Sequence, residues 1–410
     1  MKSKELFATA LGIKSPWRIS KVEMKEGDST NTQELHIHLS FERGSLFIAS
    51  DGEAYTSYDT RQKVWRHLDF FQHPCYIHAA VPRVKKEDGK VELVEVSWAR
   101  PGSGFSLLFE SYVLQLIELE MPVNKVASLV GEYPTRMWTI LNFYVGTAYD
   151  KKDHSQITQL GIDETSTKKG HSYITVAVDM ERREVVHVTK GKNKESVSKI
   201  QQYLENKGSK AEQIEEVSLD MSPAFISGSL ESFPNAGLTF DRFHVKKLLN
   251  KAMDKVRAIE RKEHDLLKGH KYTFLKSEEK LSDTKKAERD ELLKLYPTLG
   301  EAYRLKILFD DFWEMTTEQE AENFLNDWCA QAQKTKIHPF IKFTKTLKNH
   351  WYGIINYIQT GLTNAILEGL NSKIQLTKRR ARGYRDVNNF ITMIYLIAGN
   401  LDLNYPHESL

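Results

Sequence analysis

Three acidic residues stand at positions from which a metal site could be built. Asp163 ends an apolar run in GIDE, Asp220 ends another in VSLDMSP, and Glu368 lies in the helix-like stretch NAILEGLN. Carboxylate oxygens are the ligands that Mg²⁺ and Mn²⁺ prefer. Two such ions, about 4 Å apart, stabilise the attacking and the leaving oxygen when a phosphodiester bond is cut. The three acids therefore predict a catalytic site that holds two Mg²⁺ or Mn²⁺ ions.

The elements around the first two acids have an informative order. We expect strands over residues 157–163, 171–179, 184–189 and 214–220, and a helix over 194–206. Short turns join the first three strands into an antiparallel meander, and the helix provides a crossover that lets the fourth strand lie parallel to the first. Asp163 and Asp220 would then project side by side. A single Asp at a strand end is usually a turn former, so the prediction depends on all three acids together.

A basic run comes after Glu368 along a predicted helix over 362–380, and a further helix is expected over 386–397. From Glu368 to Arg385, six basic residues stand against one acid, a local charge of +5. We predict that five of them bind DNA phosphates: Lys378, Arg379, Arg380, Arg382 and Arg385. The alternative is a solvated helix end, where the helix dipole favours basic residues. Asn371 and Gln375 share a helix face with Glu368 and could contact the substrate or position the carboxylate.

The segment 123–142, VNKVASLVGEYPTRMWTILN, has the pattern of a helix-turn-helix motif. Ala127 suits a tight helix crossing, Gly131 the turn, and Pro134 the first turn of the second helix. Apolar residues fall at spacings that bury one side of each helix: Val126, Val130, Met137 and Ile140. Outward-facing residues of the second helix are candidate DNA contacts: Thr135, Arg136, Thr139 and Asn142. An ordinary helical hairpin is the alternative.

The chain divides into five predicted segments. Short alternating apolar runs over 34–41, 75–81 and 91–96 predict a small β-rich module in residues 1–110. The next segments are the helix-turn-helix domain (111–150), the first part of a catalytic core (151–245), a helical insertion (246–350) and C-terminal core helices (351–410). Because the charges of the insertion are mixed in sign, it is either a solvated bundle or a surface that faces DNA or a partner.

Composition narrows the class of protein. Lys and Arg total 58 and Asp and Glu 55, so any DNA-binding surface must arise from local clustering of charge. Two cysteines, Cys75 and Cys329, cannot build a disulfide framework, which favours a reducing compartment. Neither an uncharged apolar stretch long enough to cross a membrane nor a secretory core is found. We therefore expect a cytoplasmic protein.

Several stretches resemble the DDE-class insertion-sequence transposases of the ISL3 family. They are GIDETSTKKGHSYITVAVD, LDMSPAF, FDRFHVKKLLN, TNAILEGLNSKIQLTKRRARGYRDVNNF, RHLDFFQHPCYIHAAVPRV and VSWARPGSGFSLLFE, and they span about Arg66 to Leu396. The resemblance implies a ribonuclease-H-like core with a helical insertion between the second Asp and the Glu. It assigns the catalytic, metal-binding triad to Asp163, Asp220 and Glu368. It also implies a bacterial protein that is associated with the nucleoid when bound to DNA.

Two further features are compared with the family. The stretch from Asp241 to His244 looks like a D-x-x-H element near the active site of related transposases, so both residues have a possible supporting role, as has Asn371. The alternative is that His244 caps or packs the start of the next helix. Family members often carry an N-terminal zinc ribbon with paired CxxC motifs, which this chain lacks. Cys75 with His67, His73 and His78 matches no standard zinc pattern, so zinc is not expected.

The sequence thus predicts a multidomain α+β DNA transposase. It would bind the terminal inverted repeats of its element through the N-terminal module and the helix-turn-helix, cut the ends, and join the freed 3′-hydroxyls to target DNA. Because two ends must be brought together, a homodimer on double-stranded DNA is expected. The rivals are a catalytically silent, sequence-specific DNA-binding regulator derived from a transposase, and a ribonuclease or junction resolvase on the same core.

Overall fold

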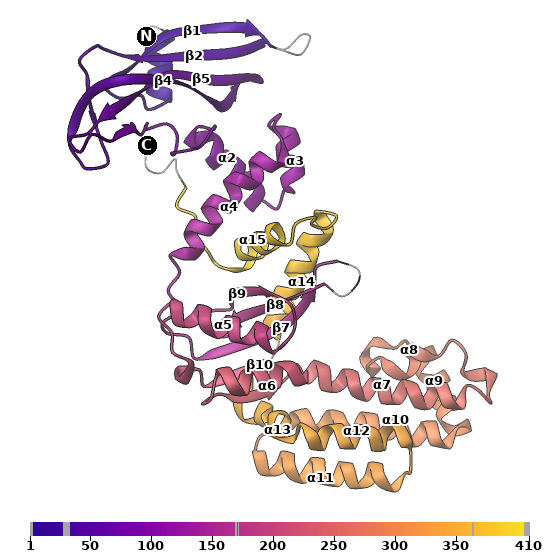
Figure 1. Cartoon of the computed structure of the whole chain (residues 1–410). Coiled ribbons are helices and arrows are strands. Elements are labelled where there is room, and N and C mark those ends of the chain that lie inside the picture. Colours follow the sequence, from indigo (N-terminus) through magenta and orange to yellow (C-terminus); the bar gives the residue numbers. More distant parts are fainter. Residues whose placement is uncertain (1–2, 28–32, 169, 171, 363–364, 406–410) are drawn as a thin grey trace. The chain divides into compact units, whose positions relative to one another are not determined.

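The computed structural model describes residues 3–27, 33–168, 170, 172–362 and 365–405 of the 410-residue chain (Figure 1). It forms two compact units, Met1–Asp150 with Leu401–Leu410, and Lys151–Asn400. Both contain helices and a β-sheet, which confirms the mixed α+β class predicted from the sequence. Within the described residues, no helix combines the length and the apolar character that a membrane crossing requires.

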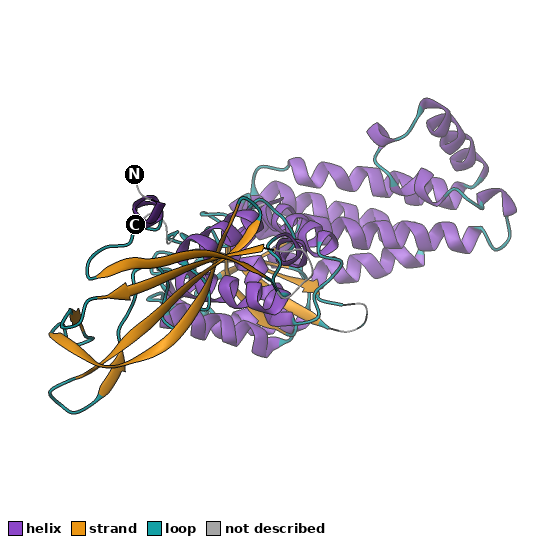
Figure 2. Cartoon of the chain, turned by 90° about the horizontal axis from the view of Figure 1, so that it is seen from above, coloured by secondary structure: helices purple, strands orange, loops and turns teal. Residues whose placement is uncertain are grey.

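The first unit begins with a twisted sheet. Its elements are α1 (Ser3–Ala10), β1 (Trp17–Glu26), β2 (Gln33–Phe41), β3 (Leu46–Ile48), β4 (Ala54–Phe70), β5 (His73–Lys85) and β6 (Val91–Leu93). The strand order is β1-β2-β5-β4-β3, with β6 paired to β5. Figure 2 shows the strands of the chain in orange. Alternate residues such as Ile37, Trp65 and Ile77 are almost completely buried on one face, as expected for a strand with period two. Two long strands, β1 and β4, were not predicted, because their sequences are mostly polar.

Three helices complete this unit: α2 (Leu107–Glu118), α3 (Val123–Leu129) and α4 (Pro134–Asp150). Val126, Ala127, Met137 and Ile140 are at most 1% exposed, so they form the apolar seam predicted for the helix-turn-helix. Gly131 has φ +68°, a conformation that glycine adopts without strain at the turn. The helical region begins at Leu107, four residues before the start of the helix-turn-helix domain predicted from the sequence (111–150).

The second unit is built on a five-stranded sheet: β7 (Gln159–Ser166), β8 (Tyr173–Asp179), β9 (Glu184–Lys190), β10 (Glu216–Leu219) and β11 (Gly237–Phe240). The strand order is β11-β10-β7-β8-β9. β7, β8 and β9 form the predicted antiparallel meander, and β10 pairs parallel with β7. The crossover is α5 (Lys194–Asn206), with the predicted bounds, and α6 (Pro223–Ser232) links β10 to β11. β11, which was not predicted, pairs parallel with β10.

Helices make up the rest of the second unit (Figure 1): α7 (Arg242–Glu260), α8 (Lys271–Leu275), α9 (Asp283–Leu295), α10 (Pro297–Leu308), α11 (Glu318–Lys334), α12 (His338–Asn349), α13 (Trp351–Thr360), α14 (Ala365–Arg380) and α15 (Val387–Ala398). Helices α7 to α13 pack into a bundle around large buried rings such as those of Phe309, Trp328 and Phe343. Gly353 brings α13 against β11, because a Cβ atom there would lie only 2.5 Å from the ring of Phe240. The bundle is therefore anchored to the edge of the sheet.

Candidate active site

Asp163 lies within β7, not at its end as predicted from the sequence. The hairpin with β8 continues for three more residues, to the pair formed by Ser166 and Tyr173. On the other side of β7, β10 ends at Leu219, whose partner is Ile162. Asp163 and Asp220 are therefore the first residues beyond this paired stretch, where β7 continues without β10 beside it.

An acidic residue directly follows each of the two parallel strands β10 and β11. Asp220 comes directly after β10 and accepts a hydrogen bond of 2.9 Å from the N–H of Ser222. Asp241 comes directly after β11, and its side chain caps α7 by accepting a 2.8 Å bond from the N–H of Phe243. His244 lies between them, with Nδ1 3.9 Å from Asp220 Oδ2 and Nε2 3.9 Å from Asp241 Oδ2. The two predicted supporting residues thus lie beside Asp220, and the capping role is taken by Asp241.

The environment of Asp163 disfavours its charged form. Burial raises the pKa of this carboxyl to about 6, and the negative charges of Asp220 and Asp241 act in the same direction. The N–H of Glu164, 2.7 Å from Asp163 Oδ1, and the His244 side chain oppose the increase. A carboxyl that is destabilised by burial and by neighbouring acids is a common sign of a functional site. A divalent cation would reverse this effect, since its charge favours the carboxylate.

Helix α14 runs along β7 in register with it. Leu367 packs against Gly161, where a Cβ atom would lie 2.9 Å from the leucine methyl. At steps of four residues along α14 and two along β7, Asn371 Nδ2 donates to Asp163 Oδ2 (2.5 Å) and Gln375 Nε2 to Thr165 Oγ1 (2.5 Å). Farther along, Lys378 Nζ donates to the carbonyl of Ser166 (2.6 Å). Four helical residues rise about 6 Å and two strand residues about 6.6 Å, so the two repeats match. This register fixes where the first turn of α14 lies relative to Asp163.

Glu368 is in that first turn and is exposed. Within the described part of the chain it makes no hydrogen bond or ion pair, and no group of three or more His, Cys, Asp or Glu side chains is arranged to hold a metal ion. The structure therefore brings Asp163 and Asp220 together and does not join Glu368 to them. Two neighbouring carboxylates such as Asp163 and Asp220 suit Mg²⁺ or Mn²⁺, but as placed they form an incomplete ligand set.

The predicted DNA contacts differ in their surroundings. Thr135, Thr139 and Asn142 are exposed on α4, as expected for a recognition helix. Arg136 is paired with Glu132 at 2.5 Å and lies 4.1 Å over the ring of Phe105, so it holds the turn against the preceding segment. In the basic run, Lys378 is engaged by the Ser166 carbonyl, and four residues are exposed: Arg379, Arg380, Arg382 and Arg385.

Among the described residues of the first unit, Cys75 and the histidines are not grouped in a way that could hold a metal ion. Cys75 is 1% exposed on the core face of the sheet, and burial raises the pKa of its thiol to about 12. His67 Nδ1 lies 2.7 Å from Ser106 Oγ, while His78 Nε2 lies 2.8 Å from His36 Nδ1. His78 is three positions from Cys75 along β5, so their side chains point to opposite faces.

Sequence comparison identifies the family of this chain. The profile of the DDE-type ISL3 transposases, described as "Transposase", matches residues 160–394, more than half of the chain. The chain belongs to the ISL3 transposase family. A second profile, the helix-turn-helix domain of this transposase family, matches residues 94–145, which confirms the predicted motif and includes the whole of α2 and α3.

Curated relatives of this transposase extend the similarity. It is 26% identical to the transposase of insertion sequence element IS1557 from Mycobacterium tuberculosis, over 98% of this chain and 97% of the relative. It is 30% identical to the transposase of element IS1001 from Bordetella parapertussis, over 59% of this chain and 61% of that protein. The similarity to the first relative therefore includes the N-terminal sheet as well as the family core.

Proposed function

We propose that this transposase binds the terminal inverted repeats of its insertion sequence, cuts the ends of the element, and transfers them to target DNA. The observation that best supports this is the position of Asp163 and Asp220 at the edge of two parallel strands, where their charges repel each other. The strand order, an antiparallel meander with parallel β10 after it, is the order expected of a ribonuclease-H-like core. Family membership supplies the reaction class.

Asp163, Asp220 and Glu368 are the residues that would hold two divalent ions in this site. When bound, such ions stabilise the charge that develops on the attacking and leaving oxygens of the phosphodiester. Groups of the protein prepare the site: the backbone N–H of Ser222 orients Asp220, and the side chain of Asn371 orients Asp163 by donating to its Oδ2. His244 lies 3.9 Å from both Asp220 and Asp241, so it supports the orientation of Asp220, and Asp241 supports that of His244. Glu368 would have to turn toward the two aspartates from its exposed position.

DNA binding is assigned to the helix-turn-helix and to the exposed part of the basic run. Thr135, Thr139 and Asn142 of α4 are exposed. Their side chains are polar, so they could bond to base edges if α4 lies in the major groove. The arginines at the end of α14 and after it would meet phosphates close to the cleavage site. Because two ends must be cut and joined together, the active form is proposed to be a homodimer on DNA.

The decisive test is a cleavage assay with the purified full chain. The substrate is a duplex that carries the terminal repeat of the element and its flanking DNA. We expect cutting at the end of the repeat in Mg²⁺ or Mn²⁺, and none in EDTA. Binding without cutting under all metal conditions would contradict the enzymatic part of the proposal.

A second candidate is a catalytically silent regulator that only binds the repeats. The exposed position of Glu368 and the incomplete metal group among the described residues favour it. The same assay separates the two, since a regulator would show repeat-specific binding with identical DNA fragments in Mg²⁺ and in EDTA.

The raised pKa of Asp163 leads to a prediction about stability. Because its folded-state pKa is about 6 and its ordinary value is 3.8, the carboxylate destabilises the fold above pH 6, and this effect disappears as the pH falls toward 4. Asp163→Asn should therefore increase the free energy of unfolding by about 1–3 kcal/mol at pH 7 in EDTA, and by almost nothing near pH 4. Urea unfolding at both pH values measures this. If Asp163→Asn and the unchanged protein had the same free energy of unfolding at pH 7, the prediction would be contradicted. The control is Asp311→Asn, which replaces an exposed acid.

A further inference from the structure

One exposed face of α7 begins at the acidic residues of the candidate site. Phe243 is 52% exposed although it is a large apolar residue. Its backbone N–H is bonded to Asp241, and its ring centroid lies 5.7 Å from that of His244, which faces Asp220. Single exposed apolar residues are common on protein surfaces. Phe243 differs from such residues because its ring lies beside the acids of the candidate site and because a row of basic residues follows it along the helix.

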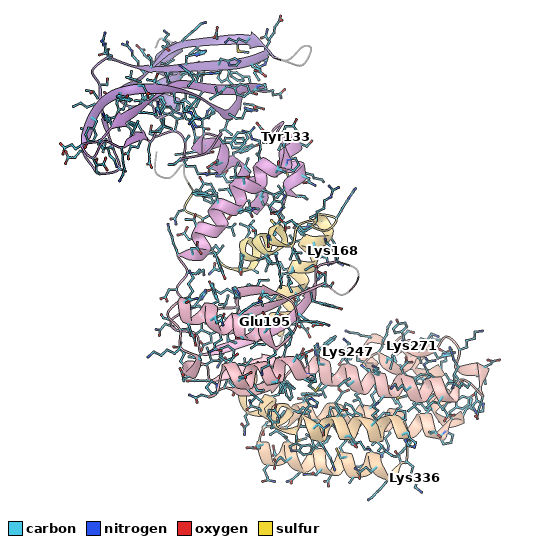
Figure 3. The ribbon with its side chains drawn as sticks, in the orientation of Figure 1. Tyr133, Lys168, Glu195, Lys247, Lys271 and Lys336 are labelled. Carbon is cyan, nitrogen blue, oxygen red and sulfur yellow. The ribbon has the colours of Figure 1, made fainter. Side chains whose placement is uncertain are left out.

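Lysines continue the same face at intervals of four residues: Lys247, Lys251 and Lys255, all exposed. Each step of four residues rises about 6 Å, so together with Phe243 they form a stripe about 18 Å long. Figure 3 labels Lys247 on α7 and Lys336 on the opposite side of the helical bundle. We name Phe243, Lys247, Lys251 and Lys255 the α7 stripe.

The stripe lysines differ from three basic residues on or close to α7, each of which is paired with an acid. Lys246 pairs with Asp310 at 2.6 Å, and Arg257 and Lys271 pair with Asp254 at 2.7 and 3.2 Å. None of the three stripe lysines forms an ion pair with any residue that the structure describes. Like charges four residues apart destabilise a helix. An uncompensated row of lysines is thus unfavourable for α7 itself and favourable for binding a polyanion.

We propose that the α7 stripe is a track for the DNA strand that enters the acidic site. The lysines bind its phosphates, and Phe243 stacks on a base next to the phosphate that is cut. Base stacking on an aromatic ring is independent of sequence, which suits DNA outside the specifically read repeat. This inference rests on the proposed function, because it places the scissile phosphate at Asp163 and Asp220. On this proposal, this face of the insertion binds DNA and is neither merely solvated nor a surface for a protein partner.

The salt dependence of DNA binding tests the lysines. Fluorescence anisotropy with the labelled repeat-and-flank duplex, in EDTA over a range of NaCl concentrations, compares the full chain with the variant K247Q/K251Q/K255Q. The slope of log K against log salt should decrease in magnitude by about 2–3, since each phosphate contact contributes about 0.9. The control K334Q/K336Q/K342Q removes three exposed charges around the start of α12 and should change the slope by less than about 1. Equal slopes for the stripe variant and the unchanged protein would overturn the track.

Base stacking is tested with 2-aminopurine placed beside the cleavage position. Binding should quench its fluorescence in the unchanged protein and in Phe243→Trp, but not in Phe243→Ala. Leu230→Ala, which removes an equally exposed apolar side chain from α6, is the control. Quenching that persists in Phe243→Ala would overturn the stacking role. If the unchanged protein shows these binding effects but cuts no DNA with any metal, the proposed function fails while the track stands.

Discussion

Replacing Asp163 or Asp220 by Asn is expected to reduce DNA cleavage and strand transfer by roughly a thousandfold or more. Metal-assisted stabilisation of the transition state is worth several kcal/mol, and about 1.36 kcal/mol corresponds to a factor of ten in rate. Asn keeps the size of the side chain but removes the charge that holds a cation. The two residues lie at the edge of one parallel strand pair, so each should be needed and the double variant should be little worse than either single one.

Binding provides the check on this result. The affinity of both variants for the repeat duplex should equal that of the unchanged protein, because the helix-turn-helix belongs to the other compact unit. Asp311→Asn removes an exposed acid from the helical insertion and should leave cleavage unchanged. Strand transfer by Asp163→Asn in Mg²⁺ at the rate of the unchanged protein would refute the assignment of the site.

Local signals in the sequence were sufficient for several elements. Helix α5 has the predicted bounds because Asn193 and Ser196 form a capping box and because its apolar residues recur with helical spacing. The helix-turn-helix could be predicted from Ala127, Gly131 and the buried seam around them. The meander and the parallel crossover could be inferred from the short turns and from α5. In each case, the signal used for the prediction lies in residues that are close together in the sequence.

Features that depend on distant residues could not be predicted. β11 consists of four residues and is recognisable only by its pairing with β10. The end of β7 was placed too early, since the strand is prolonged by its hairpin with β8 and not by its own sequence. The register of α14 depends on the fit of Leu367 against Gly161, which lies far from it in the sequence. For the same reason, the sequence could not indicate that Lys378 bonds to the Ser166 carbonyl.

Glu368→Gln is the second prediction with a large effect. We expect cleavage to fall by roughly a hundredfold to a thousandfold, because the carboxylate would complete the ligand set of the two ions. The free energy of unfolding in EDTA should not change, since Glu368 is exposed and makes no hydrogen bond or ion pair with a described residue. This combination separates Glu368 from Asp163, whose replacement should stabilise the metal-free protein at pH 7.

The matched control for Glu368 is Glu195→Gln, which also neutralises an exposed Glu on a helix of the second unit (Figure 3). It should cut DNA at the normal rate, because its partner is Lys199 on the surface of α5. If Glu368→Gln kept full activity, Glu368 could not be the third acid that binds the metal ions together with Asp163 and Asp220. Asp241, which already lies across His244 from Asp220, would then be the carboxylate to test next, since it needs no movement of α14 to approach the site.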